Sequence, residues 1–217
     1  MNRTITITGV GKGSIKPDQI VITLALETID YEYEKTMQLA TAAIATLNEA
    51  VHSAGFGKKD LKTTHFAIDT YYESYRDKNN DYKKRFSGYK CQHTLKLTFD
   101  YDTVQLSQVL TAMAKAEVYP ELDIQFTVKD TRAVSEQLLV NATENARHKA
   151  EILVRAAGAE LGQLLNIDYS WKDIYFHSPT HYQRDSQIMM EAAMPEIEPQ
   201  DIAVQDSVSF VWEILNE

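Results

Sequence analysis

Apolar and polar residues alternate along several stretches of the chain, as they do in half-buried β-strands. The predicted strands cover residues 3–10, 19–28, 61–72, 86–101, 122–128, 164–171 and 202–214. The strands at 61–72 and 86–101 flank a polar turn at residues 77–81, which predicts a long hairpin. In the last strand one face collects the apolar residues Val204, Val208, Phe210 and Trp212.

Three other stretches repeat apolar residues every three or four positions, which is the spacing of one helix face. Asp30, Asp102 and Asp130 stand where each helix should begin, because an aspartate side chain can accept hydrogen bonds from the first free N–H groups. Glycines at 55, 57 and 158 end the first and third helices. The expected inward faces are Met37, Ala40, Ile44, Leu47, Val51 and Ala54; Leu106, Leu110 and Met113; and Val134, Leu138, Ala142, Ala146, Ala150, Leu153 and Ala157.

The element order is therefore ββαββαβαββ. It predicts an α+β fold in which antiparallel or mixed β-sheets pack against two long helices and one shorter helix. We expect residues 1–217 to form a single domain, which could be built from two interleaved α/β halves. Residues 172–200 contain three prolines and no sustained periodicity, so a long irregular loop is expected there.

The glycine-rich segment at residues 9–14, G-V-G-K-G-S, allows two interpretations. Glycine-rich loops can bind phosphate, but this spacing matches no phosphate-binding motif and a strand rather than a helix follows. We therefore interpret the segment as a hairpin turn or bulged corner between the first two strands.

Composition narrows the classes of function. The chain has 217 residues, 44% of them hydrophobic, and a formal net charge of -9. That charge disfavours binding to nucleic acid, and no segment approaches the roughly 18 apolar residues of a membrane span. The first residues lack the apolar core of a signal peptide, so the expected location is the cytoplasm.

The sequence contains neither the metalloprotease motif HExxH nor the serine-nucleophile motif GxSxG. We therefore assign no catalytic, cofactor-binding or metal-binding residue and no cofactor. An alternative is that His177, His181, Asp185 and Glu191 converge in the 172–200 loop, which would then cover a metal, a small ligand or a hydrolase site.

The single cysteine, Cys91, lies in a predicted strand. We interpret it as a small, semi-buried apolar side chain. The alternative, direct thiol chemistry at Cys91, requires an accessible thiolate with a low pKa.

The predicted hairpin is rich in tyrosine at positions 71, 72, 75, 82 and 89. Tyrosine suits protein interfaces because it buries apolar area and keeps a hydroxyl group. Ordinary packing between the two strands would explain the same residues. Both interpretations stay open.

Four segments carry a resemblance to a known family. They are ITGVGKGSIKPDQIVITL at 7–24, the Gly-Tyr pair at 88–89, ARHKAEILVRAAGAELG at 146–162 and PEIEPQDIAVQDSVSFVWEI at 195–214. In this order they resemble the SIMPL-domain family, whose bacterial members carry labels such as oxidative-stress defence or periplasmic immunogenic protein. The resemblance implies an α+β fold that self-assembles, and it implies no catalytic residue.

Together these observations predict a non-enzymatic, self-associating scaffold or binding protein. We expect a homo-oligomer that can bind a protein partner, with a link to stress response implied only by the resemblance.

Overall fold

The computed structural model describes residues 3–170, 173–180, 182–184 and 197–216. Its elements are β1 (Thr4–Ile15), β2 (Gln19–Asp30), α1 (Tyr33–Ser53), β3 (Lys62–Arg76), β4 (Tyr82–Asp100), α2 (Thr103–Lys115), β5 (Glu121–Thr127), α3 (Thr131–Ala156), β6 (Ala159–Asp168), β7 (Tyr182–Arg184) and β8 (Ile202–Asn216). The predicted α+β class is confirmed. The short strand β7 lies within the stretch that was expected to be an irregular loop.

Two compact units share the chain, and each combines segments that are distant in sequence. Unit 1 contains Met1–Asp18, Thr127–Pro179 and Pro199–Glu217, and unit 2 contains Gln19–Phe126 and Thr180–Glu198.

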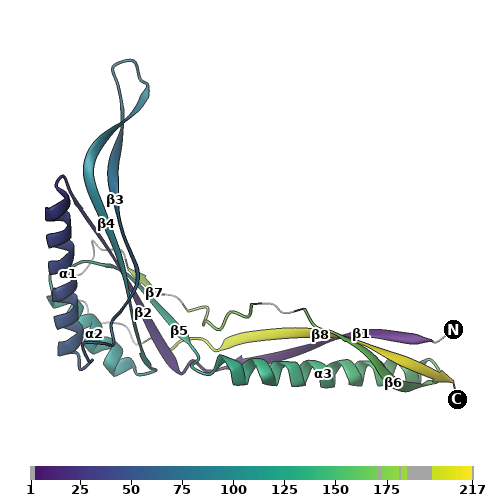
Figure 1. Ribbon diagram of the computed structural model, residues 1–217. Helices are drawn as coiled ribbons and strands as arrows, with labels where there is room; N and C mark the ends of the chain where they lie inside the picture. The colour runs from purple at the N-terminus through teal and green to yellow at the C-terminus, as the bar shows by residue number, and fades with distance from the viewer. Residues whose placement is uncertain (1–2, 171–172, 181, 185–196, 217) are drawn as a thin grey trace. The chain divides into compact units, whose positions relative to one another are not determined.

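Unit 1 is a three-stranded sheet in the order β1-β8-β6, packed against α3 (Figure 1). The alanine stripe of α3 faces this sheet, and Ala142, Ala146 and Ala150 are fully buried. The predicted inward face of β8 is confirmed, because Val208, Phe210 and Trp212 form one cluster with these alanines. Small side chains on the helix let its backbone lie close to the strands.

The glycines of β1 complete this close approach. A Cβ atom added at Gly9 would lie 1.9 Å from the carbonyl oxygen of Ala142, and one added at Gly11 would lie 1.9 Å from that of Leu138. The helix backbone thus occupies the space of a side chain, and only glycine fits. The turn interpretation of residues 9–14 is wrong: the segment lies inside β1, and β1 and β2 belong to different sheets.

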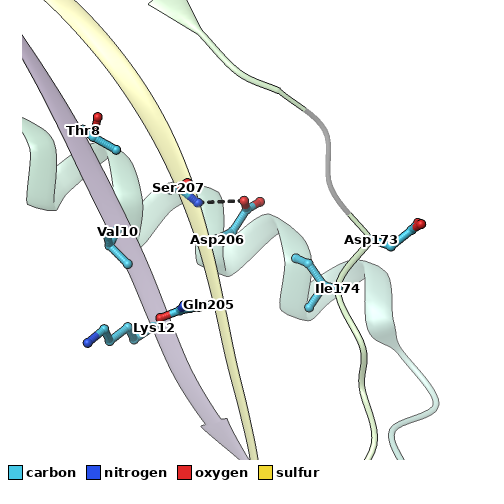
Figure 2. A pocket seen from close by; sticks show the side chains of 8 residues that line it. All are labelled: Thr8, Val10, Lys12, Asp173, Ile174, Gln205, Asp206 and Ser207. Atoms are coloured by element: carbon cyan, nitrogen blue, oxygen red, sulfur yellow. Dashed lines mark hydrogen bonds between the residues drawn. The ribbon is translucent and has the colours of Figure 1, made fainter.

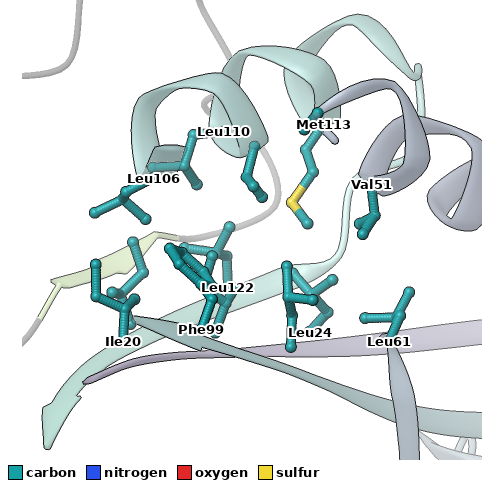
Figure 3. Packing of buried hydrophobic residues seen from close by; sticks show 14 of the residues in the cluster. Ile20, Leu24, Val51, Leu61, Phe99, Leu106, Leu110, Met113 and Leu122 are labelled. Carbon is teal, nitrogen blue, oxygen red and sulfur yellow. The ribbon is translucent and has the colours of Figure 1, made fainter. Parts of the chain in front are cut away.

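Unit 2 is a five-stranded sheet in the order β3-β4-β2-β5-β7, covered by α1 and α2. Figure 3 shows Val51 of α1 and Leu110 and Met113 of α2 facing Leu24 and Leu122 of the sheet. Each such fully buried aliphatic side chain stabilises the fold by about 1.5–3 kcal/mol. The predicted inward face of α2 is confirmed.

Helix starts follow the expected chemistry in two of three cases. The carboxylate of Asp102 accepts hydrogen bonds from Val104 N and Gln105 N, and that of Asp130 accepts one from Ala133 N. Helix α1 instead begins after Glu32, because the Asp30 carboxylate binds the Glu32 N–H at 3.1 Å and β2 continues to Asp30.

The inward face of α3 differs from the prediction at one end. Leu153 is 52% exposed, whereas Val154 is buried. The buried stripe keeps a step of four residues from Ala142 through Ala150 to Val154, so the three-residue step to Leu153 was wrong.

Candidate functional site

Strands β3 and β4 extend beyond the sheet to which they belong. β2 pairs with β4 only as far as Asp30, which lies opposite Tyr89. β3 and β4 continue to pair with each other beyond that point, first with Tyr71 opposite Gly88 and then with Tyr72 opposite Phe86. Residues 72–86, here called the arm, thus form a two-stranded ribbon without a third strand among the described residues (Figure 1). Such a ribbon is only marginally stable by itself in water.

A bulge separates the arm from the sheet. Tyr71 lies opposite Gly88 and Tyr72 opposite Phe86, so β4 has one additional residue at this point. Gly88 has φ 123°, and a Cβ atom there would lie 2.2 Å from the carbonyl oxygen of Asp30. Glycine is required for both reasons, and the bulge bends the strand where the arm begins.

The tip of the arm is held by polar contacts. The Asp77 carboxylate accepts hydrogen bonds from the backbone N–H groups of Asn79 and Asp81 and pairs with Lys83. The Lys83 ammonium, together with the two backbone donors, lowers the pKa of Asp77. The Arg76 guanidinium lies 4.6 Å from the ring centre of Tyr82 and also donates to the Tyr82 hydroxyl. The turn is therefore well defined although it is exposed.

Aromatic rings cluster at the base of the arm. The rings of Tyr31, Tyr72 and Tyr89 all pack edge-on against Phe86, with centroids 5.5–5.8 Å apart, and Tyr33 packs on Tyr89. These rings stay open to solvent: Tyr31 is 68% exposed, Tyr72 51% and Phe86 37%. Contiguous exposed apolar surface is a mark of a protein-binding site.

Ring packing within the protein explains part of the tyrosine-rich hairpin, and the protein-contact interpretation stays a prediction. Tyr72 packs on Phe86 across the two strands, and Tyr89 packs on Phe86 of its own strand and on Tyr33 of α1. Tyr75 and Tyr82 are exposed nearer the tip, and Tyr71 is half-buried. Sequence reasoning missed Tyr31, Tyr33 and Phe86. Tyr31 and Tyr33 form a second aromatic group just after β2. The sequence could not show that this group lies beside Phe86, because the pairing of β2 with β4 was unknown.

A groove of about 480 Å³ in unit 1 is lined by residues of β1, β8 and the segment at 173–174. Figure 2 shows the amine of Lys12 and the carboxylate of Asp173 pointing away from each other. The buried carboxylate of Asp206 accepts hydrogen bonds from the Tyr169 hydroxyl at 3.0 Å and from Ser207 N at 2.7 Å.

These contacts give Asp206 a structural role. Burial, followed by the hydrogen bond to Asp206, raises the pKa of Tyr169 and keeps its hydroxyl protonated as a donor. The charged groups around the groove do not converge on a point where a substrate atom could react.

The residues of the alternative metal or ligand site are only partly described. His177 is exposed and forms a β-bridge with Thr127. His181, Asp185 and Glu191 lie outside the described residues. Within the residues that are described, no group of three or more histidine, cysteine, aspartate or glutamate side chains could hold a metal ion.

Cys91 and His93 are buried in β4. Cys91 is 1% exposed, and burial raises the pKa of its thiol, which disfavours the reactive thiolate. His93 donates to or accepts from the Thr63 hydroxyl through Nε2 at 2.8 Å, and burial lowers its pKa. Both residues act as parts of the core.

The structure is thus that of an α+β protein with a two-stranded arm that exposes aromatic rings. The family described as SIMPL, protein of unknown function (DUF541), matches residues 5–212. The chain belongs to the SIMPL family, as the sequence resemblance indicated.

Two curated relatives are each named 26 kDa periplasmic immunogenic protein, one from Brucella melitensis biotype 1 and one from Brucella abortus strain S19. Each is 25% identical to this chain over 163 residues, which is 75% of the chain and 65% of the relative. The chain therefore spans less than two thirds of the length of these relatives.

The expected cytoplasmic location is contradicted by these names, because both relatives are periplasmic proteins. That expectation depended only on the missing apolar core in the first residues of this sequence. None of the helices in the described part of the chain has the length and apolar character needed to cross a membrane.

Proposed function

We propose that the protein is an exported, non-enzymatic binding protein that associates with copies of itself, and that the arm is a principal contact surface. The observation that carries this proposal is the combination of an unsupported two-stranded ribbon with exposed aromatic rings along it.

A lone hairpin is marginally stable, and Tyr72 and Phe86 leave a large part of their rings in water. Covering these rings with another protein surface would add hydrophobic stabilisation of about 25 cal/mol for each Å² buried. The arm would then be most stable in a complex.

Tyrosine and arginine are enriched in the energetic centres of interfaces, and the arm carries Tyr72, Tyr75, Arg76, Tyr82 and Arg85. Export is supported by the periplasmic location named for both Brucella relatives.

The test is size-exclusion chromatography with light scattering at tens of micromolar protein. We expect a mass that is a multiple of 24.7 kDa. The double variant Tyr72→Ser/Tyr82→Ser should dissociate, because loss of a central ring costs about 2 kcal/mol or more, or roughly a 30-fold weaker Kd.

The matched control is Tyr119→Ser, which changes an exposed tyrosine outside the arm and should leave the mass unchanged. A wild-type protein that elutes as a strict monomer would refute self-association. Equal masses for the wild type and the arm variant would instead show that assembly uses another surface.

A further inference from the structure

The two edges of the unit 1 sheet differ in how their backbone groups are satisfied. β1 forms one edge, and three side chains spaced four residues apart on α3 bind its backbone. Asn145 accepts from Val10 N at 3.1 Å, Lys149 donates to the Thr8 oxygen at 3.3 Å, and Asn141 donates to the Lys12 oxygen at 3.4 Å. The helix therefore blocks this edge against pairing with another strand.

β6 forms the other edge, and it is open. Among the described residues it pairs with β8 alone, so one side of its backbone has no neighbouring strand. Leu164, Leu165 and Ile167 are 46%, 49% and 54% exposed. An exposed apolar edge of this kind is a template for an added strand.

A groove continues this edge onto the helix side of the sheet. It has a volume of about 350 Å³ and is lined by Leu161, Leu164, Phe210 and Trp212 at its base. The two aromatic rings stack with their centroids 5.2 Å apart. Arg147 and Glu151 on α3 also line it, but they neutralise each other in an ion pair. The groove thus presents apolar surface next to an open strand.

Charge indicates what occupies this edge. β6 contains the acidic residues Glu160 and Asp168 and no basic residue. The arm contains five basic and three acidic side chains, and Lys83 and Arg85 are already paired with Asp77 and Glu73. The remaining excess is positive, in a protein whose net charge is -9. The arm is therefore complementary to the β6 edge in charge.

The two surfaces also match in form. The arm ends in two short strands whose outer edges have no partner among the described residues, and its exposed rings need an apolar surface to cover them. The β6 edge offers an unpaired strand beside an apolar groove.

We infer that the arm of one copy docks as an added β-ribbon on the β6 edge of a second copy, with its aromatic rings over the groove. This inference rests on the proposed self-association and specifies its geometry. The contact joins two different surfaces, so it is heterologous and leaves each bound copy with one free arm or one free β6 edge. Assembly can therefore continue until a ring closes or a filament forms.

Complementation between two variants tests this geometry. The arm variant is Tyr72→Ser/Tyr82→Ser, and the edge variant is Leu165→Lys/Ile167→Lys, which places charges on exposed positions of β6. Each variant alone should be monomeric by light scattering. An equimolar mixture should form a pair of twice 24.7 kDa, because the intact arm of one variant still binds the intact edge of the other.

Ile152→Lys is the control for the edge variant, since Ile152 is 53% exposed but lines a groove beside β1. It should keep the wild-type mass. Formation of the mixed pair also proves that both variants are folded.

Other outcomes overturn the inference. An arm variant that stays oligomeric points to β6 pairing with β6, and an edge variant that stays oligomeric points to arms pairing with arms. Two monomeric variants with native circular dichroism that fail to pair also refute it. A monomeric wild type refutes the proposed function itself, so the two failures are distinguishable.

Discussion

Replacing Gly11 by alanine should destabilise unit 1, although alanine is only one methyl group larger. The added Cβ would lie 1.9 Å from the carbonyl oxygen of Leu138 and 2.9 Å from the backbone nitrogen of Ala142. Both atoms belong to the helix backbone, so no side-chain rotation can relieve the overlap. Either α3 or β1 must move, and the packing of the alanine stripe on the sheet would be lost.

The magnitude follows from the overlap. Overpacking of a well-packed core costs about 1–3 kcal/mol, and a backbone contact belongs at the upper end of that range. Alanine regains about 0.4–1 kcal/mol because it restricts the unfolded chain more than glycine does. We therefore expect a net loss of about 2 kcal/mol, which lowers the Tm by roughly 4–8 °C in a chain of this size.

Gly13 in the same strand provides a matched control. A Cβ atom there would meet only the side chains of Leu138 and Val204, both at the ordinary contact distance of 3.5 Å. Gly13→Ala should therefore leave the Tm unchanged or raise it slightly, by the same unfolded-state effect. Gly9→Ala should behave like Gly11→Ala, since its Cβ would lie 1.9 Å from the Ala142 oxygen.

The assay is thermal unfolding followed by tryptophan fluorescence. Trp212 is 6% exposed and stacks on Phe210 in the core of unit 1, so its emission reports the unfolding of that unit. If Gly11→Ala unfolds at the same temperature as Gly13→Ala, the close contact between α3 and β1 does not exist as described.

Asn145→Ala should cost about 0.5–1.5 kcal/mol in urea unfolding, because a backbone N–H of β1 loses its acceptor. Burial lowers the pKa of His93, so protons bind the unfolded chain more readily and stability should fall as the pH drops through about 6.5; His93→Leu should remove that dependence. Cys91 should react with a thiol reagent only after the chain unfolds, since it is 1% exposed. Elemental analysis should find no stoichiometric metal; a metal that disappears in His177→Ala/His181→Ala would support the alternative site.

The elements themselves were largely predictable because their signals are local. The starts of α2 and α3 follow from single aspartates, and the face of β8 follows from strict alternation. The cap of α1 was not predictable from the sequence alone, since Asp30 serves as the last residue of β2 in a pairing with β4. Asp30 is suited both to a helix cap and to a strand end, and tertiary structure decides between these two roles.

The pairing of strands was not predictable, because it depends on residues far apart in sequence. β1 pairs with β8, which places Ile7 opposite Phe210. Glycine is favoured both in turns and where a helix backbone lies close to a strand. The role of Gly9 and Gly11 could therefore be assigned only once the strand pairing was known. The arm was predictable as a tyrosine-rich hairpin. The projection of the arm beyond β2 was not predictable. The residues of the hairpin carry no information about where the neighbouring strand β2 ends.

Open strand edges are a hazard, since any extended chain can pair with them. The β6 edge and the arm both carry features that restrict the partner. The register of β6 shifts between Leu161 and Leu164 and again before Asn166, so a regular strand cannot follow it along its whole length. The arm is short and keeps an excess of positive charge after its ion pairs have formed, which disfavours pairing between identical arms through like charges. The acidic, apolar β6 edge lacks this repulsion, so the features that prevent general aggregation leave the arm-to-edge contact as the favoured one.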